Sequence, residues 1–533
     1  MANAENASSE YDKSFFGHPG GLSTLFFTEM WERFSYYGMR ALLVLYMVAA
    51  VEKGGLGFST PDATAIYGLY TASVYFLPLI GGWLADRFIG AKRATLIGGV
   101  IIAAGHFALA VPTLTFFYLG LVLVAVGTGF LKSNISAMVG DLYDEDDERR
   151  DGGFSIFYMG INLGAFAAPF VCGGLAIYNW HWGFAAAGVG MVAGLIQYVI
   201  GKEKLAGVGE PPVKDELEST SLSTAYLIQL GAVVVVSIIA LIVSYYYFLP
   251  FAVELANNPE AIAKRVAEGL PALNPTTEAI GNTLKYVLIP VLVIGGLIAV
   301  LFTGMQDKLT SDDWKRLGII IILFLFAALF WAGFEQAGSS FNLFADQLTN
   351  RNFGNWEMPT AWFQSINAIM IVIMAPIFGI MWVKWGKKQP NDVFKFALGL
   401  FFLALGFVVM AYAAGLTGAG KVSPMWLVVV YFLHTCGELF LSPVGLSSMT
   451  KLAPGKMVGL MLGVWFLASS LGSFAAGQIA GEFKPESAAL VGLFWKVAIV
   501  VFVGAALALV LSFVVGGFLK SKQKTAEVPI EPA

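Results

Sequence analysis

The feature that most constrains this chain is a series of apolar runs, each about as long as a membrane is thick. A helix that crosses the hydrocarbon core needs about 20 mostly apolar residues. Fourteen runs of this kind, bounded by charges or by Pro and Gly clusters, begin near Leu25, Pro61, Ala94, Thr115, Gly153, Trp182, Ala225, Leu284, Leu317, Thr360, Val393, Pro424, Met457 and Ala488. Only 13% of the 533 residues are charged, against about 25% in an average soluble domain. Lipid must therefore solvate most of the surface, and we expect an all-α integral membrane protein with 14 transmembrane helices.

The loop charges predict the orientation of these helices. Lys and Arg are enriched in cytoplasmic loops, and a cytoplasmic N-terminus would put 21 of them inside and 7 outside. An even number of helices then places both termini in the cytoplasm. The first 13 residues lack the basic and apolar regions of a signal peptide, so the first helix is expected to act as the insertion signal. We predict a multi-pass protein of the plasma (inner) membrane.

Two corresponding loops indicate that the chain has two related halves. Residues 82–93 and 379–388 are both short, basic and punctuated by glycine. The first resembles the loop signature of the major facilitator superfamily, whose fold has two six-helix halves around a central cavity. The resemblance implies a six-helix bundle in 1–205, a linker with two extra transmembrane helices in 206–310, and a second six-helix bundle in 311–533.

Seven ionisable residues fall deep within the predicted membrane spans. They are Glu29, Glu32, Arg33, Arg40, Lys132, Glu335 and Glu438. Each such charge costs about 2.5–3.5 kcal/mol on insertion scales, and such residues usually mark a substrate or ion path. At about 100° per residue, Glu29, Arg33 and Arg40 lie on one stripe of the first helix. This stripe cannot face lipid and is expected to line a cavity, although an ion-pair network that only orders the bundle is the alternative.

The two halves contribute charges of different sign to this set. The cations Arg33, Arg40 and Lys132 come from the first half, whereas the second half supplies Glu335 and Glu438. This arrangement suits a zwitterion, whose carboxylate would meet the cations and whose ammonium would meet a carboxylate. Motion that makes or breaks a Glu–Arg pair also changes how tightly the carboxylate holds a proton. The same residues can thus couple proton flow to alternating access.

Five ordered motifs resemble those of the proton-dependent oligopeptide transporter (POT) family. The run Glu-Met-Trp-Glu-Arg-Phe-Ser-Tyr-Tyr-Gly at 29–38 matches the ExxERFxYYG motif of its first helix in full. Segments similar to the other signatures lie at 127–134, 157–164, 330–336 and 438–446. The resemblance implies a symporter that imports di- and tripeptides with protons by alternating access. It also implies no cofactor besides the coupling proton, and a protein that functions as a monomer in the bilayer.

The resemblance also assigns roles to individual residues. For proton coupling it implies Glu29, Glu32, Glu335, Arg40 and Lys132, with Arg40 paired to Glu335 and Lys132 to the carboxylates of the first helix. The implied substrate-binding residues are Arg33, Arg40, Lys132, Tyr37, Tyr75, Asn162, Trp331, Glu335, Asn367, Glu438, Trp465 and Ser469. Within this set, Arg33 and Lys132 would receive the peptide C-terminus, whereas Asn162, Asn367 and Glu438 would receive its N-terminus.

Other functions find little support in the residues. The net charge of -4 and the lack of a basic block argue against nucleic-acid binding. No metal site is expected, because His434 and Glu438 lack a third ligand, and no catalytic set lies at membrane depth, so an intramembrane enzyme is disfavoured. A drug/proton antiporter of the same superfamily is the main alternative, since 160–174 loosely resembles an antiporter-type glycine and proline stretch. Such a protein would not be expected to contain the full first-helix motif together with Glu335 and Glu438.

Overall fold

The computed structural model describes residues 13–144, 147, 149–205, 207–211, 309–453 and 458–526. The two helices predicted near Ala225 and Leu284 lie outside the described residues, as does most of the 206–310 linker. The other twelve predicted helices are all present. Ten helices in the described part are long and apolar enough to cross a membrane. Helix α1 falls outside that set by composition, because Glu29, Glu32, Arg33 and Arg40 lie along its length.

Helices of the first half follow one another through short connections. They are α1 (Gly20–Val48), α2 (Thr60–Leu84), α3 (Ala91–Leu109), α4 (Leu114–Asp141), α5 (Arg150–Ala176) and α6 (Trp180–Gly201). Single turns separate or extend them at η2 (Val51–Lys53), η3 (Ala85–Ile89) and η4 (Lys202–Leu205). Helix α4 continues through Ser133, whose hydroxyl donates to the Pro78 carbonyl of α2 over 3.1 Å.

The second half begins with a helix that is interrupted in the membrane interior. Its helices are α13 (Ser311–Phe334), α14 (Ser340–Gln347), α15 (Ser365–Trp385), α16 (Asp392–Leu416), α17 (Met425–Leu452), α18 (Val458–Ala480) and α19 (Ser487–Ala526). The shorter elements are η7 (Glu335–Gly338), β1 (Asn352–Phe353), β2 (Trp356–Glu357), η8 (Thr360–Gln364), η9 (Gly386–Lys388) and η10 (Thr417–Ala419). Helix α13 ends at the buried Glu335, and η7 redirects the chain into α14.

Capping residues account for the largest error in the predicted helix starts. The helix expected from Leu317 begins six residues earlier, at Ser311. Thr310 accepts a hydrogen bond from the Asp313 amide over 3.2 Å, and the Asp313 carboxylate accepts one from the Thr310 amide over 3.1 Å. This capping box satisfies amides that the first turn leaves free, so the helix includes polar residues that precede the apolar run.

A small hairpin is the one feature of the described residues that the all-α prediction lacks. Strands β1 and β2 pair antiparallel, with Asn352 opposite Glu357 and Phe353 opposite Trp356. Gly354 has a φ of 65° at the turn, a conformation that glycine adopts at little cost. Strands of two residues are too short to show the alternation of polar and apolar side chains from which a strand is predicted, so the hairpin was not predicted.

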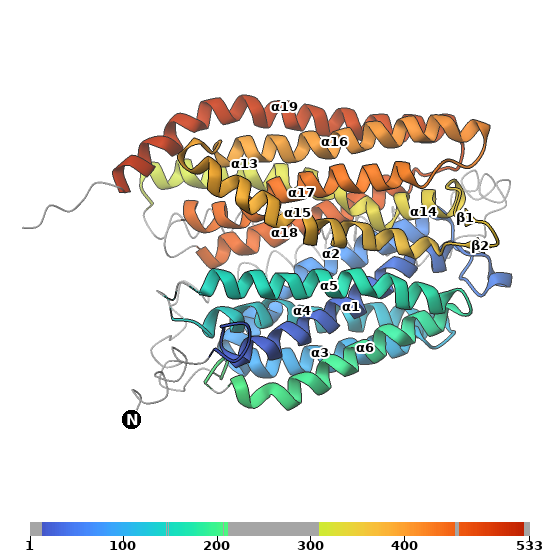
Figure 1. Ribbon diagram of the computed structural model, residues 1–533, viewed down its shortest axis with the longest axis horizontal. Coiled ribbons are helices and arrows are strands. Elements are labelled where there is room, and N and C mark those ends of the chain that lie inside the picture. The colour runs from blue at the N-terminus through green and yellow to red at the C-terminus, as the bar shows by residue number, and fades with distance from the viewer. Residues whose placement is uncertain are drawn as a thin grey trace, which may run out of the picture.

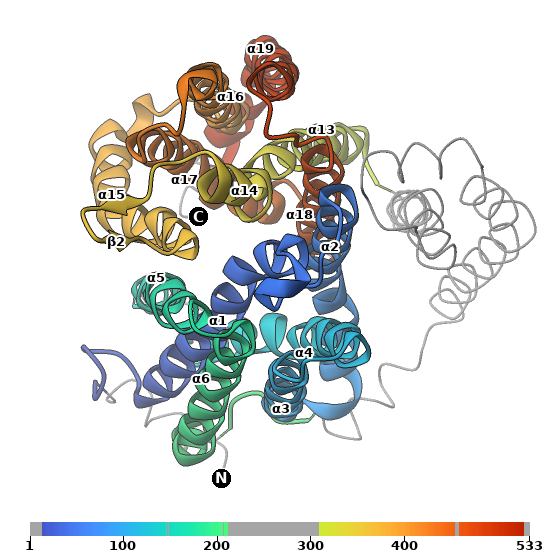
Figure 2. The ribbon, with the colours of Figure 1, turned by 90° about the vertical axis from the view of Figure 1, so that its right-hand side faces the viewer.

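The helices form two groups that correspond to the two halves of the chain. In the first group α1 packs on α5 and α6, and α3 packs on α4; in the second, α16 packs on α17 and α19, and α13 on α18. Figure 1 shows these long helices running in similar directions, and Figure 2 shows the two groups end-on with α2 and α18 where they meet. A methyl group on Gly68 of α2 would lie 2.9 Å from the Cα atom of Gly477 in α18. Glycine therefore permits a close backbone approach between the two groups.

Candidate functional site

The first part of the site is a cluster of charges on one face of α1. The Arg33 Nε atom lies 3.1 Å from the Glu29 carboxylate and also pairs with the Glu32 carboxylate. All three side chains are buried, and Glu32 is fully so. Among the described residues, Glu29 Oε2, Glu32 Oε1 and Arg33 Nη2 have no hydrogen-bond partner. A cluster of two carboxylates and one guanidinium with free donor and acceptor capacity can accept a proton or an additional polar ligand.

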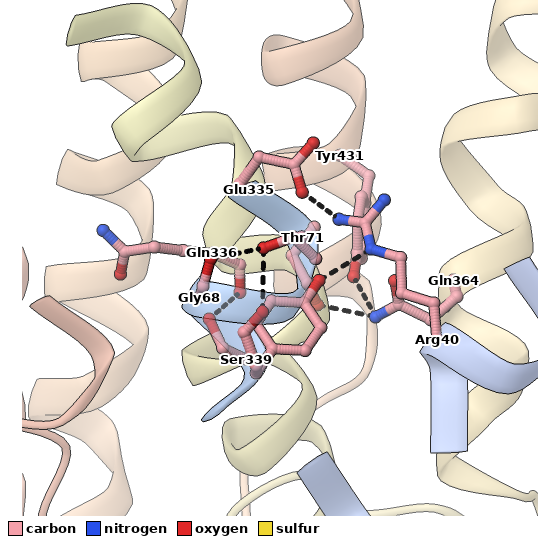
Figure 3. Close-up of polar contacts among 10 residues, drawn as sticks. Arg40, Gly68, Thr71, Glu335, Gln336, Ser339, Gln364 and Tyr431 are labelled. Carbon is pink, nitrogen blue, oxygen red and sulfur yellow. Dashed lines mark hydrogen bonds and ion pairs between the residues drawn. The ribbon is translucent and has the colours of Figure 1, made fainter. Parts of the chain in front are cut away.

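The second part is an ion pair that joins the two halves. Arg40 of α1 donates to the Glu335 carboxylate over 2.5 Å, as Figure 3 shows. It also donates to the Tyr67 hydroxyl of α2 over 2.6 Å. Arg40 is 6% exposed and Glu335 1% exposed, so water screens the pair little. The predicted pairing of Arg40 with Glu335 is thus confirmed. Because a buried charge without a partner is costly, this contact favours arrangements in which α1 and η7 touch.

Lys132 does not make the contact that the resemblance implied. Its ammonium lies 3.9 Å from the centre of the Tyr75 ring, a cation–π contact between α4 and α2. No carboxylate of the described residues lies within ion-pair distance of it. The prediction of a Lys132 pair with Glu29 or Glu32 was wrong for this conformation. Arg33 stands four positions after Glu29 on the same helix, a spacing at which side chains meet readily, and it also pairs with the adjacent Glu32.

The third part brings two predicted residues together in the second half. The Asn367 amide of α15 donates to the Glu438 carboxylate and to the Thr435 hydroxyl, each over 3.0 Å. Glu438 and Thr435 both lie on α17. Glu438 is half-buried, its hydrogen-bond partner on a neighbouring element is a neutral amide, and no cation of the described residues lies within ion-pair distance of it.

Four further predicted residues form no hydrogen bond with the charged side chains of the site within the described part of the chain. The Asn162 amide donates to the Tyr158 carbonyl of its own helix over 2.9 Å. Trp331 Nε1 is buried without a hydrogen-bond partner among the described residues. Trp465 packs against Phe396 with ring centres 6.3 Å apart, and Ser469 is buried one turn further along α18. Their roles as substrate-binding residues remain predictions, as does that of Tyr37, which lies under Arg40 with the guanidinium 5.8 Å from its ring centre.

Sequence reasoning missed several residues that connect the parts of the site to one another. Tyr67 accepts from Arg40, and Gln364, Tyr431 and Thr435 connect the second-half segments. The sequence could have predicted that Tyr67 faces the site, because Tyr67, Thr71 and Tyr75 recur every four residues along the second helix. This stripe of polar side chains in a membrane span faces the protein interior. Gln364, in contrast, stands at a helix start, where a polar residue is unremarkable.

The contacts of α5 with the second group lie toward one end of the helices, whereas α2 and α18 also meet further along, where Ser470 donates to the Ala72 carbonyl over 2.8 Å. Near the end of α5, Phe170 meets Trp362 of η8 with ring centres 4.9 Å apart, and Ser365 donates to the Phe166 carbonyl over 2.8 Å. Toward the opposite end, Tyr158 of α5 is 41% exposed and Val383 of α15 is 81% exposed. On the side of α5, the groups therefore touch at the end where α1 finishes and α2 begins.

Membrane-length helices in two groups, with charges of both groups buried where the groups meet, define a transporter of the membrane-embedded, helical class. Among the described residues, no group of three or more His, Cys, Asp or Glu side chains could hold a metal ion. Both cysteines, Cys172 and Cys436, are buried and unpaired.

Comparison with known proteins identifies the family. A model of the POT family, PTR2, matches residues 92–493. The peptide transporter YePEPT of Yersinia enterocolitica is 41% identical over 496 residues, which cover 89% of this chain and 90% of that protein. A di-/tripeptide transporter of Lactococcus lactis subsp. cremoris is 38% identical over 483 residues, covering 89% and 91% of the two chains. A crystal structure of a peptide transporter POT in complex with sulfate is 40% identical with a TM-score of 0.78, covering 94% of this chain and 96% of that one.

The chain belongs to the POT family. The alternative of a drug/proton antiporter is accordingly not favoured. The family match at 92–493 includes four of the five motifs on which the resemblance rested, those at 127–134, 157–164, 330–336 and 438–446.

Proposed function

We propose that this protein imports di- and tripeptides together with protons by alternating access. Relatives that are named peptide transporter and di-/tripeptide transporter support the substrate class. The observation that supports it most directly is the division of charge across the site. Arg33 and Lys132 come from the first group of helices, whereas Glu438 with Asn367 comes from the second. A short peptide is a zwitterion, so its two ends match the two sides.

The proton-coupling residues in this proposal are Glu29, Glu32, Glu335, Arg40 and Lys132. Glu335 is bound to Arg40 over 2.5 Å, and a protonated carboxyl group would no longer form that ion pair. Proton uptake at Glu335 would therefore release α1 from η7, whereas proton uptake at Glu29 or Glu32 would release Arg33 toward a substrate carboxylate. Both changes link proton binding to motion between the groups.

The membrane arrangement belongs to the same proposal. We infer 14 transmembrane helices, with six-helix bundles in 1–205 and 311–533, two extra helices in 206–310, and both termini in the cytoplasm of a cell whose inner membrane holds the protein. The protein is expected to act as a monomer without a metal or organic cofactor. With this orientation, the end at which the two groups touch faces the outside, and transport begins with their separation there.

Uptake of labelled dialanine by proteoliposomes tests the proposal. An inward proton gradient should drive accumulation above the external concentration, and a protonophore should abolish it. An exchanger of the antiporter type would not accumulate dialanine under that gradient. Empty liposomes and an excess of unlabelled dialanine are the controls for leak and for nonspecific binding.

A further inference from the structure

The side chain of Gln364 joins three segments of the second half. Gln364 is the last residue of η8, and its amide nitrogen donates to the Ala337 carbonyl of η7 over 2.6 Å. The same nitrogen donates to the Tyr431 hydroxyl of α17 over 3.2 Å. Figure 3 shows Gln364 and Tyr431 beside the tip of Arg40. A primary amide has two N–H groups, so one nitrogen can supply both bonds at the same time.

On one side, Gln364 is connected to the ion pair between the halves. Ala337 lies two residues after Glu335 within the single turn η7, which spans only Glu335–Gly338. A turn this short moves as a unit, so a displacement of Glu335 away from Arg40 would also displace the Ala337 carbonyl. Position 338 in η7 has room only for glycine, because a side chain there would collide with the Tyr67 hydroxyl.

On the other side, Gln364 is connected to the Asn367–Glu438 pair by two routes. Along the chain, Asn367 follows Gln364 by three residues, across the junction of η8 and α15. Through space, the Tyr431 carbonyl accepts from the Thr435 hydroxyl over 2.7 Å, and that hydroxyl accepts from Asn367 over 3.0 Å. Tyr431, Thr435 and Glu438 stand four and three residues apart and share one face of α17.

We propose that Gln364 is a positioning residue that transmits the state of the Arg40–Glu335 pair to the Asn367–Glu438 pair. This inference rests on the proposed function, in which Glu335 takes up the proton and Glu438 receives the peptide amine. When Arg40 and Glu335 are paired, η7 holds the Gln364 amide, which holds the Tyr431 side chain and with it the face of α17 that bears Thr435 and Glu438. Release of Glu335 frees this chain of hydrogen bonds, so the proton site and the amine site change together.

The variant Gln364→Met tests this role with little change in side-chain volume. Methionine has a similar length and is unbranched, but it cannot donate a hydrogen bond. Tyr431→Phe removes only the hydrogen bond from Gln364 to α17 and preserves the one from Gln364 to the Ala337 carbonyl, so it offers a second and milder test. Gln389→Met is the matched control, because Gln389 also donates to a backbone carbonyl of the second half, that of Trp382 over 2.8 Å.

The measurement compares proton-driven accumulation of dialanine with counterflow exchange in the absence of a gradient, using the full chain in proteoliposomes. Coupling between sites typically corresponds to a 5–150-fold effect, so we expect Gln364→Met to lower the accumulation ratio at least about tenfold. Counterflow should stay within about threefold of the wild-type rate, since a factor of three is below the usual range of coupling. Tyr431→Phe should lower accumulation less, and Gln389→Met should change neither quantity.

Three outcomes would overturn the inference. Accumulation in Gln364→Met and Tyr431→Phe could equal that of the wild type, which would show that neither bond transmits coupling. Accumulation and counterflow could instead fall in proportion, which would indicate a purely structural role. Absence of both activities in the wild type would refute the proposed function itself, and the positioning role with it.

Discussion

Replacing Glu335 by Ala should move the two groups of helices apart at the end where they touch. The change removes the carboxylate that Arg40 binds over 2.5 Å, while the Tyr67 hydroxyl still accepts from Arg40 over 2.6 Å. Breaking a buried ion pair by removal of one partner costs about 3–5 kcal/mol. Because Tyr67 still satisfies part of the guanidinium, we expect the lower end, about 3 kcal/mol. At about 1.4 kcal/mol for each factor of ten, the ratio of touching to separated conformers should fall roughly a hundredfold.

Distances between spin labels on the two groups measure this ratio. Ile177 after α5 and Phe353 in β1 are 61% and 54% exposed and accept a label without disturbing the core. The buried thiols of Cys172 and Cys436 would first be replaced by serine so that labelling is specific. The short-distance population should dominate in the labelled wild type and become a minor one in Glu335→Ala.

The double variant Arg40→Ala/Glu335→Ala supplies the decisive comparison. It removes both charges, so no buried charge remains without a partner, and its effect should be smaller than the sum of the two single effects. If the single effects simply add, or if Glu335→Ala leaves the distance distribution as in the wild type, the ion pair does not hold the groups together.

Three further predictions concern other parts of the site. Glu32→Gln should abolish proton-driven accumulation of dialanine but keep counterflow exchange, because the amide cannot release a proton; full accumulation by this variant would exclude Glu32 from coupling. Arg33→Ala should weaken dialanine binding by about 2–5 kcal/mol, the cost of truncating one member of a buried charge pair, and isothermal titration with an unchanged affinity would remove Arg33 from the carboxylate site. Gly68→Val should slow counterflow exchange, since its side chain would meet Gly477 across the α2–α18 contact, whereas Gly379→Val on α15, where a methyl group meets open space, should not; equal rates for both would refute the argument.

The proposed coupling depends on two short segments that interrupt the regular helices. The turn η7 places Glu335 at its first position, and η8 places Gln364 at its last. Glu335 is buried and the backbone leaves helical geometry at Ser339, directly after η7, whereas Gln364 is half-buried and η8 leads directly into α15. An unbroken helix through Glu335 would fix its carboxylate rigidly on α13, whereas a separate turn allows Glu335 and Ala337 to shift together.

Membrane-length helices and buried charges were predictable because both depend on local sequence. A run of about 20 apolar residues forms its hydrogen bonds internally wherever it lies in lipid, so the twelve helices within the described residues were found with starts within six residues. The stripe of charges on α1 follows from helical periodicity alone. The division of the seven charges between the halves is likewise a matter of sequence position.

Only the tertiary structure decided which of these charges meet. Arg33, rather than Lys132, binds the carboxylates of α1, and Lys132 lies over the Tyr75 ring. The sequence cannot supply this choice, because it depends on the distance and rotation between α1, α2 and α4. The bridge made by Gln364 between η7 and α17 likewise joins residues 27 and 67 positions apart. Such contacts are set by how helices pack across the interior. The seven charges were therefore visible in the sequence, whereas their partners were not, apart from the Arg40–Glu335 pair that the family resemblance implied.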